Sequence, residues 1–204
     1  MNYCKMSDCD PIQLLGKKAN YYLRFLSIVN DLPKFTYHPD PIATGSVIQS
    51  DETCECCGKK RGYVYCTTPY GERAIEFVCP WCIASGTAST KLGASFADSW
   101  PLSQAEISKE IIDAVTLRTP GYISWQQECW IACCKDACEY HGDADPDELA
   151  ALDGDDRLRV ARDFDLPITD FEELLRHYVP KGSPAIYKFK CRHCGTVHYN
   201  WDCH

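Results

Sequence analysis

Fifteen cysteines occur among the 204 residues of this chain. Eight of them form four pairs at the spacing of metal ligands: Cys54 with Cys57, Cys79 with Cys82, Cys134 with Cys138, and Cys191 with Cys194. Four thiolates around one Zn²⁺ make a closed tetrahedral site, which stabilises a fold and leaves no position open for a substrate. The cysteines therefore predict two structural zinc ions, and they indicate little about a substrate.

The first predicted site combines Cys54 and Cys57 with Cys79 and Cys82. A C-x-x-C knuckle lets two sulfurs converge on one ion while backbone N–H groups point at them. The 21 residues between the pairs slightly exceed the usual 15 to 20, and a longer hairpin would account for this. Cys56 could replace a neighbour as ligand, although the C-x-x-C spacing favours Cys57.

The sequence Cys79-Pro-Trp-Cys82 also has the spacing of a thiol-redox motif. Such a motif needs a βαβ context, which is missing here, and the second cysteine pair nearby favours a metal. A thiol-redox or metal-dependent enzyme that uses Cys79 and Cys82 remains the alternative.

The second predicted site joins Cys134 and Cys138 to the knuckle Cys191-Arg-His-Cys194. Residues four apart lie on one face of a helix, so a helix from about residue 125 to 140 would present both sulfurs to one ion. The spacing does not settle the register, because a second pair in this stretch, Cys129 and Cys133, is also four apart.

The charge of the chain restricts its partners. The formal net charge is −8, and eight thiolates with two Zn²⁺ ions would bring it to roughly −12. This balance disfavours nucleic acid, and a basic protein is the better electrostatic match. No apolar run is long enough to span a membrane, and the first residues do not resemble a secretory signal. We expect a cytoplasmic protein.

An acidic run follows the second set of cysteines, between residues 142 and 156. Its start resembles a calcium-binding loop, but Glu148 stands where the loop needs glycine and Gly154 where it needs glutamate. The run is either a solvated face with helix caps or a docking patch for a basic protein. The candidate partner-binding residues are Asp143, Asp145, Asp147, Glu148, Asp153, Asp155 and Asp156.

The remaining patterns predict an α+β fold: a ribbon-like hairpin stabilised by zinc, several helices, and a C-terminal hairpin with a zinc knuckle. Residues 1–32 would form a helical extension, with its helix near 12–29, and residues 33–204 the main domain. The predicted strands are 62–66, 74–78, 185–191 and 196–201. Besides 125–140, helices are predicted after a capping box of Ser103 and Glu106, and over 146–152, 156–164 and 170–178, with Asp145 and Thr169 as caps.

Several motifs together resemble the CbrC family over about residues 33–204. They are Phe35-Thr-Tyr-His-Pro-Asp-Pro, Gly45-Ser, the Cys54 knuckle, Arg61-Gly-Tyr-Val-Tyr, Cys79-Pro-Trp-Cys-Ile-Ala, Thr119-Pro-Gly-Tyr, Trp125-Gln-Gln-Glu and the Cys134 pair. The resemblance implies a small bacterial protein whose family name is associated with colicin tolerance. It favours Cys134 and Cys138 over Cys129 and Cys133 as ligands, and it supplies no catalytic residue.

The leading hypothesis is a non-enzymatic zinc-binding immunity or tolerance protein. It would neutralise a basic bacterial toxin or nuclease by direct binding, because the chain is acidic and shows no catalytic constellation. Besides the enzyme at Cys79 and Cys82, a zinc adaptor in regulation is a further alternative.

Overall fold

The structure is a computed structural model that describes residues 32–204. The helix predicted near residues 12–29, and with it nearly all of the predicted extension, lies outside these residues. Residues 34–204 form a single unit. Within the described range, no helix combines the length and the apolar character that crossing a membrane requires.

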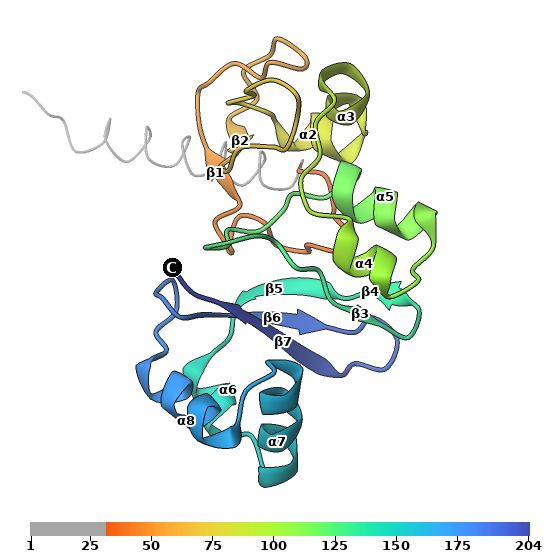
Figure 1. The fold of residues 1–204 in the computed structure, drawn as a ribbon. Coiled ribbons are helices and arrows are strands. Elements are labelled where there is room, and N and C mark those ends of the chain that lie inside the picture. Colours follow the sequence, from red (N-terminus) through yellow and green to blue (C-terminus); the bar gives the residue numbers. More distant parts are fainter. Residues whose placement is uncertain (1–31) are drawn as a thin grey trace, which may run out of the picture. The chain divides into compact units, whose positions relative to one another are not determined.

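The C-terminal half of this unit is built around a three-stranded antiparallel sheet (Figure 1). Its order is β5 (Glu139–Asp143), β6 (Ala185–Lys190) and β7 (Val197–Asp202). The β6–β7 hairpin pairs Ala185 with Asp202 and Lys190 with Val197, so the sequence 191–196 forms its turn. This confirms the predicted C-terminal strand, knuckle and strand.

Three short helices cover one face of the sheet: α6 (Pro146–Ala150), α7 (Gly154–Asp163) and α8 (Ile168–His177). Their apolar residues pack with sheet residues into one core. That core includes Leu149, Val160, Phe164, Phe171, Ile186 and Tyr199. The three predicted helices are confirmed, and the Asp145 side chain caps α6 by accepting the N–H of Asp147. The predicted Thr169 cap is wrong, because α8 already begins at Ile168 after Pro167.

The opposite face of the sheet packs against an aromatic core. Tyr122 stacks on Tyr140 with ring centroids 4.5 Å apart, and Trp130 lies 5.9 Å from Phe189. Strand β6 supplies both cores, because neighbouring side chains on a strand point to opposite faces. Tyr187 and Phe189 thus lie in the aromatic core, while Ile186 packs under the helices.

The helix predicted over residues 125–140 is wrong. The segment is extended and contains a tight hairpin of β3 (Ala132–Cys133) and β4 (Asp136–Ala137). Its two turn residues, Cys134 and Lys135, have φ of 53° and 60°, the left-handed backbone that the central positions of a type I′ turn require. The four-residue spacing of the cysteines is also that of one helix face, but this segment has no helical hydrogen bonding.

The N-terminal half of the unit holds β1 (Val47–Gln49), β2 (Tyr63–Tyr65), α2 (Pro80–Ala84), α3 (Thr87–Leu92), α4 (Trp100–Gln104) and α5 (Lys109–Arg118). The hairpin predicted from strands 62–66 and 74–78 does not form, because β2 pairs with β1 instead. The predicted strand 74–78 is not part of a sheet, although the carbonyl of Val78 accepts the N–H of Tyr65 at 2.8 Å. The predicted capping box is also wrong, since Ser103 lies inside α4 and Ser108 occupies the N-cap position of α5.

Candidate metal centres

The first centre brings together the four predicted cysteines, whose sulfurs all lie within 4.8 Å of one another. The sulfurs of Cys54 and Cys82 are 3.8 Å apart, and those of Cys57 and Cys79 are 3.9 Å apart. Zn–S bonds of about 2.3 Å give a tetrahedron with edges of about 3.8 Å. A disulfide would need about 2.05 Å. The geometry is therefore that of a tetrathiolate metal site.

The local backbone explains how the first centre forms. Gly58 has a φ of 68° and donates its N–H to the carbonyl of Cys54 at 2.8 Å, which closes the knuckle. The Cys54 sulfur in turn accepts the N–H of Cys79 at 3.3 Å. Cys79 is the N-cap residue of α2, so the helix begins at the metal site and carries Cys82 toward it.

The first centre is enclosed by apolar side chains. Cys54 and Cys79 are almost fully buried in a core with Phe35, Ile75 and Phe96. Cys56 lies in the same core but outside the tetrad, as the C-x-x-C spacing predicts. Burial raises the pKa of the Cys79 thiol to about 12. A bound cation is what would let such a buried sulfur carry charge.

The second centre contains Cys133, Cys134, Cys191 and Cys194. The Cys133 sulfur lies 3.8 Å from the sulfur of Cys134 and 3.8 Å from that of Cys194. Two tight turns supply the ligands: the β3–β4 turn and the β6–β7 turn. The predicted link between the middle of the chain and its C-terminal knuckle is present.

The predicted ligand Cys138 is not part of this tetrad. It lies beyond the β3–β4 hairpin, fully buried in the aromatic core, and burial raises its pKa to about 12. Its carbonyl accepts the Trp130 indole N–H at 2.8 Å. Cys133 takes the place of Cys138, because a hairpin turn, and not a helix, presents the sulfurs.

A hydrogen-bonded network around Asp136 holds the two turns of the second centre together. One carboxylate oxygen accepts the hydroxyl of Tyr37 at 2.8 Å. The other lies 2.9 Å from Arg192 Nη1 and 2.9 Å from His193 Nε2. The Arg192 guanidinium also lies over the Tyr37 ring, 5.3 Å from its centroid. Sequence reasoning missed this network, because Tyr37 and Asp136 are 99 residues apart.

The two centres differ in exposure. Cys134 and Cys194 are exposed, whereas Cys54, Cys79 and Cys82 are buried. The Thr196 hydroxyl lies 3.1 Å from the Cys194 sulfur, and hydrogen bonding to Thr196 lowers the pKa of that thiol to about 6. The Cys194 sulfur of the second centre is thus both easily deprotonated and accessible to solvent.

Most of the predicted acidic patch has structural partners. Asp145 and Asp153 cap α6 and α7. Glu148 forms an ion pair with Lys188, Asp156 with Arg159, and Asp143 accepts the backbone N–H of Lys181. The other two, Asp147 and Asp155, are exposed. Among the described residues, no hydrogen bond or ion pair engages the carboxylates of these two.

Comparison with known proteins gives one family. Residues 32–203 match an uncharacterised protein family, UPF0167. A UPF0167 protein of Pseudomonas aeruginosa is 47% identical over 84% of this chain and 97% of its own length. Counterparts from Mycobacterium bovis and Mycobacterium tuberculosis are each 36% identical, over 81% of this chain and 90% of theirs. No solved structure matches.

These matches correct the resemblance to the CbrC family. The family found is UPF0167, and the relatives carry that family's name. The association with colicin tolerance, which entered only through the CbrC resemblance, loses its basis.

Proposed function

The chain belongs to the UPF0167 family, and we propose that it is a non-enzymatic zinc-binding protein that acts by binding a basic protein partner. The observation that carries the proposal is the distribution of charge. Residues 143–178 contain twelve aspartates and glutamates and four arginines, which leaves seventeen residues of each sign elsewhere. Asp143 belongs to β5, so the layer of α6, α7 and α8 accounts for −7 of the net charge of −8.

Zinc is the metal that we propose for the two tetrads. All eight donors are cysteine sulfurs, and tetrahedral sites of four thiolates select zinc or iron among the common metals. Four protein ligands leave no coordination position for a water or a substrate. The expected role of both ions is structural, which is consistent with a protein that acts through its surface.

The helical layer has the features of a docking surface for a basic protein. Asp147 and Asp155 are exposed, and their carboxylates have no partner among the described residues. Two large apolar side chains on the same layer are also exposed, Leu158 at 49% and Ile168 at 38%. A negative field speeds encounter with a positive partner, and apolar anchors then supply affinity. A basic bacterial toxin or nuclease is one partner of this kind.

The alternative of an enzyme at Cys79 and Cys82 has weaker support. A redox cysteine needs a lowered pKa and access to its substrate. Burial instead raises the pKa of Cys79, and Cys82 is buried as well. Both sulfurs also stand in a tetrad with the spacing of a closed metal site.

Binding measurements on charge variants test the proposal. The zinc-loaded chain is assayed by biolayer interferometry against purified basic nuclease toxins and any basic protein encoded beside its gene. Binding at nanomolar concentration is expected for one of them. The double variant Asp147→Asn/Asp155→Asn should lower its association rate constant about tenfold at low salt.

The matched control is Asp51→Asn/Glu52→Gln, which removes two exposed charges outside the helical layer. It should leave the association rate within about twofold, because the attraction between two charges weakens with the distance between them. The proposal fails if no basic protein binds, or if both double variants slow association equally.

A further inference from the structure

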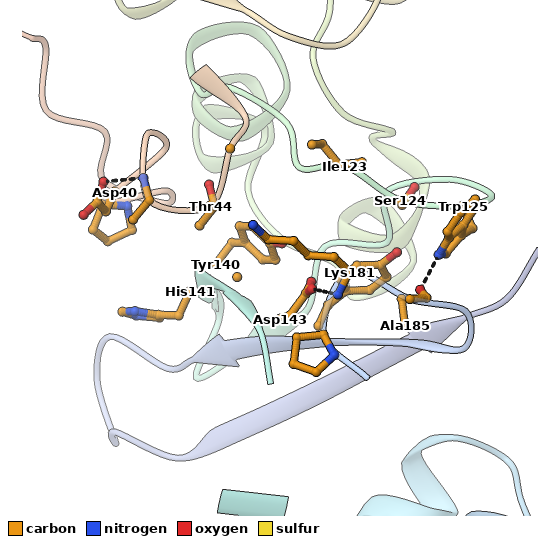
Figure 2. A pocket seen from close by; sticks show the side chains of 17 residues that line it. Asp40, Thr44, Ile123, Ser124, Trp125, Tyr140, His141, Asp143, Lys181 and Ala185 are labelled. Carbon is orange, nitrogen blue, oxygen red and sulfur yellow. Dashed lines mark hydrogen bonds between the residues drawn. The ribbon is translucent and has the colours of Figure 1, made fainter. Parts of the chain in front are cut away.

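A pocket of about 740 Å³ opens beside the β5–β6–β7 sheet, and no cysteine of either tetrad lines it (Figure 2). Four stretches of chain line it, within residues 39–45, 123–125, 140–143 and 180–187. Its volume is within the range of about 300–1,000 Å³ that small-molecule sites occupy. Neither the metal centres nor the acidic helical layer accounts for it.

The walls of the pocket are held in place by hydrogen bonds. The Trp125 indole donates to the carbonyl of Gly182 at 2.7 Å, and its backbone N–H donates to Asp202 at 3.0 Å. The other carboxylate oxygen of Asp202 accepts the hydroxyl of Tyr187 at 2.7 Å. The aromatic wall, with Tyr140 beside Tyr187, is therefore formed before any ligand arrives.

A bulge in β5 shapes the floor of the pocket. The pairing with β6 shifts register between Tyr140 and Asp143. Gly142, inside the bulge, has a φ of 94°, and a Cβ there would lie 3.4 Å from the Thr44 methyl carbon. Bulges re-aim side chains and are common beside binding sites. This one brings Asp143 into the pocket.

Four acidic or basic side chains line this pocket, Asp40, His141, Asp143 and Lys181, and the last two carry opposite charges. One Asp143 carboxylate oxygen accepts the backbone N–H of Lys181 at 2.5 Å, and burial raises the pKa of this carboxyl group. Figure 2 shows the Lys181 side chain extended across the pocket toward Thr44 and Tyr140. Among the described residues, no ion pair joins the Lys181 ammonium to any carboxylate.

We propose that this pocket binds a small zwitterion of the amino acid or dipeptide class. Its carboxylate would pair with Lys181, its ammonium with the free oxygen of Asp143, and its apolar side chain would pack against Trp125 and Tyr187. The inference does not depend on the proposed partner binding, because it uses a different surface.

A ligand with a single charge matches this pocket less well. An organic cation would pair with Asp143 and bring no acceptor to Lys181, whereas a simple carboxylate would leave Asp143 without a donor. A polar group that loses its water and finds no partner costs binding energy, so each half-matched ligand is selected against.

Calorimetric titration of the full zinc-loaded chain tests the inference. The probe is the dipeptide phenylalanyl-leucine, compared with its N-acetyl and its C-terminal amide derivatives. The dipeptide should bind at least about tenfold more tightly than either derivative, since each lacks one charge. Absence of binding up to millimolar concentration overturns the inference, and so does equal affinity for all three.

Two variants test which charge of the ligand Lys181 and Asp143 each bind. Lys181→Met should abolish the preference for the dipeptide over its amide and keep the preference over the N-acetyl form. Asp143→Asn retains an acceptor for the Lys181 N–H. It should abolish the preference for the dipeptide over its N-acetyl form and keep the preference over the amide. Lys190→Met, an exposed lysine of β6 outside the pocket, is the control and should behave as wild type. Preferences unchanged in both variants would contradict the assignment.

Discussion

The sulfurs of Cys133 and Cys194 lie 3.8 Å apart, although 61 positions separate the two residues in sequence. A metal at this point would cross-link the β3–β4 turn to the β6–β7 turn. Because the unfolded chain has no such preformed site, the binding free energy of the ion adds to the folding free energy. The second centre would thus fix the C-terminal hairpin against the middle of the chain.

The Asp136 network should be one of the larger contributors to stability in this region. Its side chain is 9% exposed and contacts Tyr37, Arg192 and His193. Asp136→Ala should lower the free energy of unfolding by about 2 to 3 kcal/mol, because the buried Tyr37 hydroxyl loses its acceptor and Arg192 keeps only one carboxylate, that of Glu139. Tyr37→Phe, which removes one hydrogen bond, should cost about 1 kcal/mol. Equal costs in urea titrations would contradict the network.

Metal removal should proceed in two phases. Cys134 and Cys194 are exposed, so a colorimetric chelator should take the second ion first. The first ion should follow more slowly, because its ligands Cys54, Cys79 and Cys82 are buried. Cys194→Ser should abolish the fast phase only. Release of both ions in one phase from the wild-type protein would show that burial does not protect the first centre.

How far the sequence predicted the metal sites depended on local structure. Cys54, Cys57, Cys191 and Cys194 belong to C-x-x-C knuckles, whose spacing alone brings two sulfurs together. Cys133 and Cys134 sit at a turn that adopts left-handed backbone without glycine or asparagine, so no turn signal marked it. The four-residue spacing to Cys138 then favoured a helix that does not form.

The helices and the C-terminal hairpin were predictable for a different reason. Asp145 precedes α6 as its predicted cap, and β6 carries Tyr187 and Phe189 two residues apart, on one face of the strand. By contrast, β1 has only three residues, which are too few to show the alternation of buried and exposed side chains that marks a strand. The pocket and the Asp136 network depend on contacts between distant segments, which no local pattern reports.

Gly121 should tolerate no side chain. A Cβ there would lie 1.9 Å from the carbonyl oxygen of Phe96 and 2.7 Å from the hydroxyl of Tyr65. Gly121→Ala should therefore lower the free energy of unfolding by about 3 kcal/mol or more. Gly154→Ala is the matched control, because nothing lies within 4 Å of its Cβ position. It should change stability by no more than about 0.5 kcal/mol, and similar melting temperatures for the two variants would contradict the packing.

His38 should make folding stability depend on pH. It is fully buried, with one ring nitrogen 2.8 Å from the Pro120 carbonyl and the other 2.7 Å from the Thr44 hydroxyl. Burial lowers its pKa from 6.5 to about 4. Above pH 6.5 neither state is protonated, whereas between pH 6.5 and 4 only the unfolded state gains the proton. Stability is therefore lost as the pH falls through this window.

The expected loss through His38 between pH 7.5 and 5.5 is about 1.4 kcal/mol. Urea titrations at the two pH values measure it, with His38→Gln as the comparison, because glutamine does not titrate. Between these two pH values, the variant should lose about 1.4 kcal/mol less stability than the wild-type protein. An identical pH dependence in both proteins would show that His38 takes up its proton in the folded state.

Zinc counting by native mass spectrometry tests the central claim most directly, namely that two tetrads hold two ions and that Cys133 belongs to the second. After saturation with zinc, the wild-type protein should carry two ions. Cys133→Ser and Cys194→Ser should each carry one, and Cys138→Ala should keep both. A Cys138→Ala protein with one ion beside a Cys133→Ser protein with two would contradict the account.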